Sequence, residues 1–297
     1  MVKFIYLAGE YMNKIIIIAD STCDLSLDLI KENDIKIVPL HVSFKGDSTD
    51  YLDGVTITRE EVYKKCDELG ITPTTGARNV NELINDFKQY VDKGYDVIFT
   101  GIGSGLSSTY NNAMIARSEV SEEHIEVVDS QNLSTGIGLL VLKMAKFRDQ
   151  GLNIHEIATK VRELVPHVSA KFCIDRLDYL HKGGRCSGMT KALAELFKIH
   201  PIAKVINNKL TVYRMPRGKY IKAVDEQINE FKKDFDNIDK DCVFITHSGH
   251  MDGEEKYIYE KLSEYIPLEN LHITEAGCVI SSHCGPKTIG ILYILKK

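Results

Sequence analysis

Residues 97–109 read VIFTGIGSGLSST, in which a short apolar run passes directly into a loop of glycine and hydroxyl residues. A continuous apolar run of this kind is typical of a strand that is buried on both faces of a parallel sheet. Three further runs also end in small polar residues, namely Ile15–Ala19, Ile125–Val128 and Val243–Thr246. Helical patterns lie between them, with apolar residues at every third or fourth position. The alternation predicts a doubly wound, mainly parallel sheet.

A second series of predicted strands and helices begins near Pro166 and includes a helix at Thr190–Phe197. The chain has 297 residues, whereas domains of roughly 100–150 residues are the commonest. We therefore predict an α/β fold of two lobes. The mainly parallel sheet is expected in residues 14–165, and a second α/β lobe with a mixed sheet in residues 166–297. Residues 1–13 are expected to form an N-terminal extension.

Composition and charge argue against several classes of partner. The formal net charge is -5 and Lys and Arg form no basic block, so we expect no nucleic-acid partner. No apolar run approaches the roughly 18 residues of a membrane helix, so we expect no stable membrane insertion. The seven cysteines are an odd number without a C-x-x-C pair, which indicates reduced thiols and a cytoplasmic location. We expect no metal and no cofactor.

The loop at residues 101–109 is the first candidate for a binding site. Loops that follow parallel strands gather at the carboxyl edge of the sheet, where open α/β folds bind ligands. The loop carries the hydroxyls of Ser104, Ser107 and Ser108, and a predicted helix begins near Tyr110. Hydroxyls and the free N–H groups of a first helical turn bind anions. The loop therefore predicts a site for a small anionic group.

A dinucleotide site is the first alternative for this loop. Gly-x-Gly after a strand, followed about 25 residues later by Asp129, partly fits the dinucleotide fingerprint. The final glycine is missing, because Thr109 or Leu106 holds its place depending on where the repeat begins. A Walker loop fails as well, since no Gly-Lys-Ser/Thr follows. A nucleotide site is therefore a weaker hypothesis for this loop than a site for a small anionic group.

Three more segments carry candidate residues. Thr75 follows Pro73 ahead of a predicted helix, which places it in a loop or an N-cap, where simple capping is the alternative. Lys182 and Arg185 flank a diglycine, and they are expected either to neutralise an anion or dock a partner, or to be ordinary cations at a helix end. His283 lies in an expected turn that returns toward the first lobe.

Five segments in this order resemble the DegV family over about residues 14–297. The segments are 20–22, 73–75, 104–110, 180–187 and 283–290. The resemblance implies two α/β lobes that hold one long-chain fatty acid, with the carboxylate at the lobe interface and the tail in an apolar tunnel. It also implies a non-catalytic carrier, similar to the subunit of a bacterial fatty acid kinase that presents the acid to a separate ATP-using subunit for acyl phosphate formation.

The resemblance also implies roles for individual residues. By position, Thr75 and Ser107 match the family's head-group hydroxyls, and His283 matches the histidine near the same group. Arg185 matches a basic loop that is implicated in the lobe interface or in kinase docking. The family usually reads Thr-Ser-x-Pro-Ser where this chain has Thr75-Gly76-Ala77-Arg78-Asn79. Arg78 is therefore a candidate for an additional cation at the head group.

Two other functions stay open at the level of sequence. One is a serine-type acyl hydrolase that uses Ser107 and His283, although the chain lacks Gly-x-Ser-x-Gly and an identifiable orienting acid. The other is a regulatory protein-interaction module, for which Arg185 would be a contact residue. A bound fatty acid would favour the carrier over both.

Overall fold

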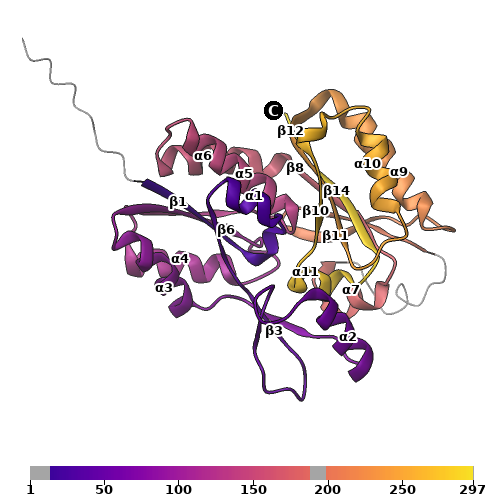
Figure 1. Ribbon diagram of the computed structural model, residues 1–297, viewed down its shortest axis with the longest axis horizontal. Coiled ribbons are helices and arrows are strands. Elements are labelled where there is room, and N and C mark those ends of the chain that lie inside the picture. The colour runs from indigo at the N-terminus through magenta and orange to yellow at the C-terminus, as the bar shows by residue number, and fades with distance from the viewer. Residues whose placement is uncertain (1–13, 188–198, 297) are drawn as a thin grey trace, which may run out of the picture.

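The computed structural model describes residues 14–187 and 199–296. It confirms the predicted α/β fold of two lobes, with a parallel sheet in one lobe and a mixed sheet in the other. In Figure 1 the parallel sheet lies in the indigo and magenta half, and the mixed sheet lies in the orange and yellow half. The predicted lobe boundary after residue 165 falls in the short 3-10 helix η2 (Val165–His167) and stays a prediction.

The N-terminal sheet is parallel throughout and has the strand order β2-β1-β6-β7. The strands are β1 (Lys14–Asp20), β2 (Ile35–Val38), β6 (Tyr95–Gly101) and β7 (Ile125–Asp129). Successive side chains of a strand point to opposite faces. Ile16 and Ile18 of β1 accordingly join the core beneath one face, and Ile17 and Ala19 join the core beneath the other. The predicted apolar runs are therefore strands buried on both sides.

Helices cover both faces of this sheet, as the doubly wound prediction requires (Figure 1). The helices on one face are α3 (Val80–Val91) and α4 (Thr109–Val120), and those on the other are α1 (Leu27–Glu32), α5 (Thr135–Asp149) and α6 (Ile154–Leu164). Phe87 of α3 packs edge-on against Phe99 of β6, with ring centroids 5.6 Å apart. Such aromatic pairs add packing energy beyond their buried area.

The second sheet has seven strands in the order β13-β12-β14-β8-β10-β11-β9. The strands are β8 (Val168–Cys173), β9 (Cys186–Ser187), β10 (Ile202–Ile206), β11 (Lys209–Arg214), β12 (Ile238–Ser248), β13 (Leu271–Glu275) and β14 (Thr288–Leu295). The predicted run Val243–Thr246 lies in β12, which is parallel to β13 and antiparallel to β14. The expectation that this run belongs to a parallel sheet was therefore correct on one side only.

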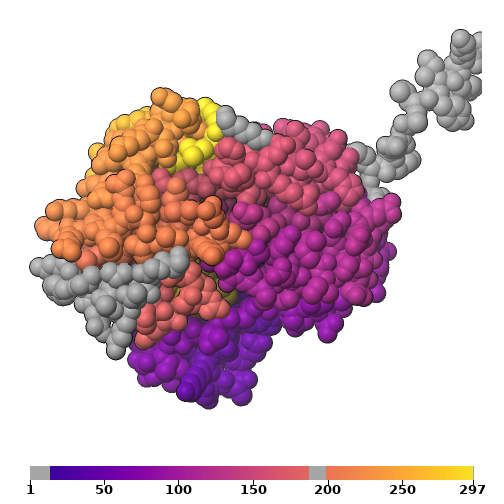
Figure 2. Space-filling view, turned by 180° about the vertical axis from the view of Figure 1, so that it is seen from behind, coloured from indigo at the N-terminus to yellow at the C-terminus, as the bar shows by residue number. Residues whose placement is uncertain are grey.

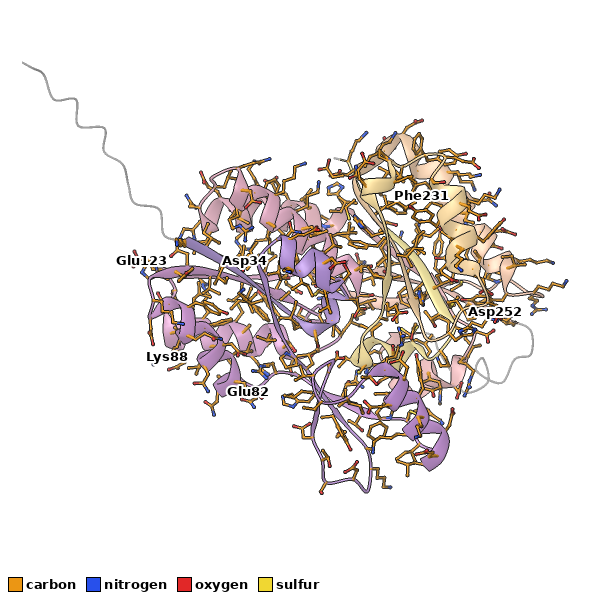
Figure 3. The ribbon with its side chains drawn as sticks, in the orientation of Figure 1. Asp34, Glu82, Lys88, Glu123, Phe231 and Asp252 are labelled. Atoms are coloured by element: carbon orange, nitrogen blue, oxygen red, sulfur yellow. The ribbon has the colours of Figure 1, made fainter. Side chains whose placement is uncertain are left out.

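Helices α9 (Ile221–Asp234) and α10 (Glu254–Leu262) cover the outer face of the mixed sheet. Phe231 of α9 points toward the sheet, and its ring lies 5.5 Å from that of Tyr293 on β14 (Figure 3). The inner face packs on α5, where every residue from Thr135 to Ala145 except Leu142 is buried. Because α5 touches both sheets, one apolar core runs across both lobes. The two coloured halves meet along a continuous boundary in Figure 2.

A small antiparallel sheet hangs below the N-terminal lobe in Figure 1 and was not predicted. Its strands are β3 (His41–Ser43), β4 (Tyr51–Leu52) and β5 (Thr74–Gly76), and helix α2 (Arg59–Leu69) belongs to the same excursion. Thr75 was expected in a loop or an N-cap, but it lies on β5 opposite Val42 of β3. Strand pairing with β3 satisfies the backbone there, and threonine is β-branched and suits a strand.

Two short helices complete the fold near the lobe interface, α7 (Leu177–Gly183) and α11 (Cys278–Cys284). Residues 281–286 were expected to be a turn, but α11 continues to Cys284 and the chain turns only at Gly285, whose φ is 73°. With ψ at 172°, Gly285 has a backbone conformation that essentially only glycine adopts. The predicted helix Thr190–Phe197 lies outside the described residues.

Three further 3-10 helices are η1 (Ser21–Cys23), η3 (Phe235–Asn237) and η4 (Leu268–Asn270). All seven cysteines are buried thiols. Over residues 14–187 and 199–296, none of the helices combines the length and the apolar character that crossing a membrane demands.

Candidate functional site

A cavity of about 170 Å³ lies where the two lobes meet, and it collects most of the predicted site residues. Thr75, Ser107, Ser108, Arg185 and His283 all contribute to its lining. They come from β5, the loop before α4, the segment after α7, and α11. Residues that are far apart in the sequence are thus brought to one place. The lining combines hydroxyls, an imidazole and a guanidinium in one cavity.

Thr75 and His283 form the central contact of the cavity. Thr75 Oγ1 lies 2.8 Å from His283 Nε2, so the bond joins the small antiparallel sheet to α11. Burial, together with the positive charge of Arg185, lowers the pKa of His283 to about 4. The imidazole is therefore neutral near pH 7. When its Nε2–H donates to Thr75, the threonine hydroxyl is left to donate to a ligand.

The other nitrogen of His283 lies against α7. Nδ1 is buried and faces the backbone of Gly183. A Cβ placed on Gly183 would fall 2.6 Å from this nitrogen, so the close approach of the ring to α7 requires glycine. Gly183, the first residue of the Gly183-Gly184 pair, therefore allows the imidazole to pack closely against α7. The diglycine that flanks the two predicted cations has a steric role at the site.

Ser107 and Ser108 stand at the start of α4. Ser107 Oγ lies 3.0 Å from Thr109 Oγ1 and accepts a hydrogen bond from the Thr109 N–H at 3.3 Å. Ser108 is the N-cap residue of α4, is exposed, and makes no side-chain capping bond. The amides of a first helical turn carry partial positive charge toward the N-terminus. This end of the cavity therefore offers hydroxyls and a helix dipole to an anionic group.

Arg185 lies at the rim of the cavity. Its side chain is exposed, and Nη1 donates a hydrogen bond to the carbonyl oxygen of Gly183 at 2.9 Å. Among the described lining residues it is the only one with a permanent positive charge. Lys182 is also exposed but is not part of the lining. Of the two predicted cations, Arg185 is placed to act on the cavity directly.

Ser104 is not brought to the cavity. Its Oγ donates to Asp129 Oδ2 at 2.6 Å, and its N–H donates to Asp129 Oδ1 at 3.0 Å. The side-chain amide of Asn208, at the tip of the β10–β11 hairpin, donates to Ser104 Oγ at 2.7 Å. Ser104 therefore fastens its loop between β7 and the second lobe. Asn208 was not predicted as a site residue, because its partner is 104 positions away in the chain.

Arg78 does not supply the additional cation that was considered for the head group. Its guanidinium makes two hydrogen bonds to Asp86 of α3, at 2.8 and 3.0 Å. A bidentate pair of this kind holds both side chains in one geometry. Arg78 is also absent from the cavity lining. Its role is to join the β5–α3 segment to α3.

Asp20 supports the loop that carries Ser107, although it was noted only as part of a sequence motif. It is fully buried at the end of β1, and its Oδ2 accepts the N–H of Ile102 at 2.8 Å. Burial is the main cause that raises the pKa of Asp20 to about 6. A Cβ on Gly101 would fall 2.1 Å from this oxygen, so only glycine admits the contact.

The remaining wall of the cavity is apolar and leads inward. It is formed by Leu40, Ile102, Leu106, Leu133, Leu210, Val279 and Ile280. A second cavity of about 20 Å³ shares Leu133, Ile280 and Cys284 with the first and continues toward Phe172 on β8 and Leu292 on β14. This volume suits about one water molecule. An elongated apolar group would therefore follow this path only with movement of the side chains that line it.

A family model described as "Uncharacterised protein, DegV family" matches residues 14–296. This chain belongs to the DegV family. A DegV domain-containing protein of Clostridium acetobutylicum is 34% identical over 286 residues, which cover 96% of this chain and 100% of the relative. One from Caldanaerobacter subterraneus is 35% identical and is covered to 99%.

Solved structures similar to this DegV chain carry descriptions of what they bind. A DegV family protein from Thermus thermophilus, described by its fatty acid binding, has a TM-score of 0.84 and 26% identity. The match covers 95% of this chain and 99% of that one. A stearic acid-binding protein from Eubacterium ventriosum has a TM-score of 0.82 and 28% identity, and the match covers 96% and 99% of the two chains.

Among the described residues, Ser107 and His283 of this DegV chain do not contact each other as the nucleophile and base of a serine hydrolase would. Nucleophile and base must lie within hydrogen-bond reach of each other, and the base needs an orienting partner. In the described residues, however, His283 Nε2 is bonded to Thr75, and Ser107 is bonded to Thr109. A histidine with a pKa of about 4 is also a weak base near neutral pH. No group of three metal-ligating side chains is found in the part of the chain that the structure describes.

Proposed function

We propose that this protein binds one long-chain fatty acid, with the carboxylate at Thr75 and Ser107 and the tail along the apolar wall. The observation that carries the proposal is the Thr75–His283 hydrogen bond at the polar end of a cavity whose inner wall is apolar. The fatty acid binding described for similar solved structures supports the same ligand class. We assign the head-group role to Thr75, Ser107, Ser108 and His283.

The energetics of such a ligand fit a site made mainly of neutral groups. A carboxylate taken out of water must receive several hydrogen bonds, and bonds to a charged acceptor are stronger than neutral ones. Two hydroxyls and the start of α4 supply these donors. Each buried methylene contributes about 0.8 kcal/mol. A tail of a dozen or so carbons would therefore dominate the affinity, while the head-group site selects the acid.

We further propose that the protein is a non-catalytic cytoplasmic carrier that presents the bound acid to a separate fatty acid kinase subunit. A carboxylate oxygen would then accept the γ-phosphoryl group of ATP on that subunit, giving an acyl phosphate and ADP. The position of Arg185 supports this role, because its exposed guanidinium lies at the rim of the cavity that would hold the carboxylate. An acid bound there would not need to leave the protein to meet its partner.

Mass spectrometry under denaturing conditions tests the ligand. Purified protein is expected to release a long-chain acid in close to equimolar amount. After delipidation, titration calorimetry should show tight binding of stearic acid and weaker binding of octadecanol, which has the same chain but no carboxylate. Protein that carries no acid after purification and binds none after delipidation would overturn the proposal.

The carrier role is tested by acyl phosphate formation with purified kinase subunit and ATP. We expect product only when the acid-loaded protein is present, and less product with Arg185→Ala. Arg148→Ala is the control, since Arg148 pairs with Asp149 at the end of α5 and does not line the cavity. Acyl ester hydrolysis by the protein alone, lost in Ser107→Ala, would instead favour the hydrolase. Pull-down of the kinase subunit by acid-free protein would favour an interaction module.

A further inference from the structure

Asp53 lies directly after β4 and is almost completely buried, with 4% of its surface exposed. Its Oδ1 accepts the N–H of Cys278 at 2.7 Å, and its Oδ2 is within 3.4 Å of the Val279 N–H. These two amides belong to the first turn of α11 and have no acceptor within the helix itself. A carboxylate from the N-terminal lobe thus caps the helix that carries His283.

The backbone of Asp53 is tied to the other side of the site. Its N–H donates to the carbonyl oxygen of Leu40 at 2.9 Å, and Leu40 directly precedes β3. Ser21 joins the same two residues, because its hydroxyl donates to Asp53 Oδ2 at 2.8 Å and accepts the Leu40 N–H at 3.1 Å. Two separate links therefore connect Asp53 to the start of β3.

Strand β3 in turn fixes Thr75, since Val42 of β3 lies opposite Thr75 of β5 in the sheet. His283 lies five residues after Cys278 on the same helix, α11. The backbone of Asp53 is thus connected to the strand that holds Thr75, and its carboxylate is connected to the helix that holds His283. Both ends of the 2.8 Å contact between Thr75 and His283 lead back to this one residue.

The fit around α11 leaves little room for adjustment. Asp24 Oδ1 accepts the N–H of Gly277, one residue before α11, at 2.8 Å. A Cβ on Gly277 would lie 3.1 Å from Asp53 Oδ1 and 3.3 Å from Asp24 Oδ1, so glycine permits both carboxylates to reach the helix. Loss of one acceptor would allow α11 to shift, and a displacement of about 1 Å is enough to break a hydrogen bond of ordinary length.

We infer that Asp53 is a positioning residue for the head-group site, which sets α11 so that His283 holds the Thr75 hydroxyl toward the carboxylate. The inference rests on the proposed function, and it adds a residue that does not line the cavity. Asp53 acts on the carboxylate through the Thr75–His283 pair, and α11 also carries Val279 and Ile280 of the apolar wall. Its removal is therefore expected to weaken recognition of the carboxylate more than recognition of the tail.

The test compares stearic acid with octadecanol in delipidated wild type and in Asp53→Ala. Glu126→Gln is the matched control, because Glu126 is a similarly buried carboxylate that bonds His155 and Arg162 away from the cavity. We expect Asp53→Ala to weaken acid binding by about tenfold or more, the scale of one lost bond to a charged group. Octadecanol binding should weaken clearly less, because only the part of α11 that lines the apolar wall affects it, and Glu126→Gln should change neither.

The second readout is whether the effects of Asp53→Ala and Thr75→Ala on acid affinity add up. If Asp53 acts through the pair, Asp53→Ala should cost little further acid affinity in a Thr75→Ala background. Equal weakening of acid and alcohol by Asp53→Ala, or full additivity with Thr75→Ala, would overturn the inference. Should Asp53→Ala not fold, Asp53→Asn carries the same test, since it keeps the shape and one acceptor oxygen. It is expected to show a smaller loss that is again larger for the acid than for the alcohol.

Nitrogen NMR of His283 in the ligand-free protein separates this inference from the proposed function. Wild type should show the shift of a hydrogen-bonded Nε2, and Asp53→Ala should lose it. Glu126→Gln should keep it. An unchanged Nε2 signal in Asp53→Ala would overturn the positioning role even if stearic acid binds. Failure of wild type to bind the acid would overturn the proposed function and leave this comparison standing.

Discussion

The backbone oxygen of Asn208 occupies the space of a side chain on Gly105. A Cβ placed on Gly105 would lie 1.9 Å from this oxygen. Asn208 is at the tip of the β10–β11 hairpin of the second lobe, and Gly105 is in the loop that carries Ser107. The absence of a side chain therefore lets one lobe press on the loop of the other. The head-group residues depend on this contact between lobes.

Gly105→Ala is expected to displace the loop or the hairpin, because the obstructing atom belongs to the backbone. Overpacking of this kind costs typically about 1–3 kcal/mol of folding stability. Thermal or urea unfolding measures the loss, and calorimetry with stearic acid measures the accompanying loss of affinity. Gly94→Ala is the control, since its φ is 78° and a Cβ there meets nothing within 4 Å. It should lose stability through backbone strain but keep its affinity.

Thr75→Ala and Ser107→Ala are each expected to weaken fatty acid binding by about 1–3 kcal/mol, the range for leaving a charged group short of one partner. Titration calorimetry on delipidated protein gives the values. Thr74→Ala is the matched control, because Thr74 is the exposed neighbour on β5 and does not line the cavity. Unchanged affinity in both site variants would remove Thr75 and Ser107 from the site.

Ser104→Ala is expected to lower stability and to leave acid affinity nearly intact. The hydroxyl of Ser104 bonds Asp129 and Asn208 and lies away from the cavity lining. Removal of one partner from such a network costs about 1–3 kcal/mol. Unfolding and binding measured on the same preparation separate the two effects. A loss of acid affinity as large as that of Ser107→Ala would place Ser104 among the ligand contacts.

The low pKa of His283 leads to an expectation about pH. Burial lowers its pKa from 6.5 to about 4, so the folded protein binds fewer protons than the unfolded chain between these values. The contribution of His283 to stability is therefore present above about pH 6.5 and is lost as the pH falls toward 4. Unfolding measured across this range should show the slope in wild type, and His283→Gln should reduce it.

The same pKa predicts that acid affinity stays constant between about pH 6.5 and about pH 8, because His283 remains neutral throughout. A histidine with an ordinary pKa would gain charge at the lower end and bind the carboxylate more tightly. Calorimetry at both pH values distinguishes the cases. Tighter binding at the lower pH that disappears in His283→Gln would show that His283 does take up a proton.

The parts of the fold that follow from local pattern were predictable from the sequence. The run Ile15–Ala19 is apolar at every position, and the structure buries both faces of the strand that contains it. The small antiparallel sheet was not predictable, because Thr74–Gly76 is only three residues long and pairs with a strand more than thirty positions earlier. Likewise, the direction of the neighbours of Val243–Thr246 depends on the connections and not on the run itself.

The site shows the same division. Thr75, Ser107 and His283 could be named from motifs, whereas the residues that hold them in place could not. Asp53 and Asn208 are single polar residues without a local pattern, and their partners lie 225 and 104 positions away. Ser104 illustrates the reverse case, because a hydroxyl in a glycine loop predicts a ligand contact as readily as a contact to Asp129. Only the three-dimensional arrangement separates the two.

From Thr135 to Ala145, helix α5 exposes almost none of its surface to solvent, since it packs between the sheets of both lobes. A fragment that ended after residue 165 would expose the apolar surface of α5 to water. The remaining fragment would lack the helix against which the inner face of its sheet packs. Neither lobe is then expected to fold when recombination transfers it alone. Recombination between relatives should therefore keep the two lobes of one protein together, and chains that combine lobes from different relatives are expected to be insoluble.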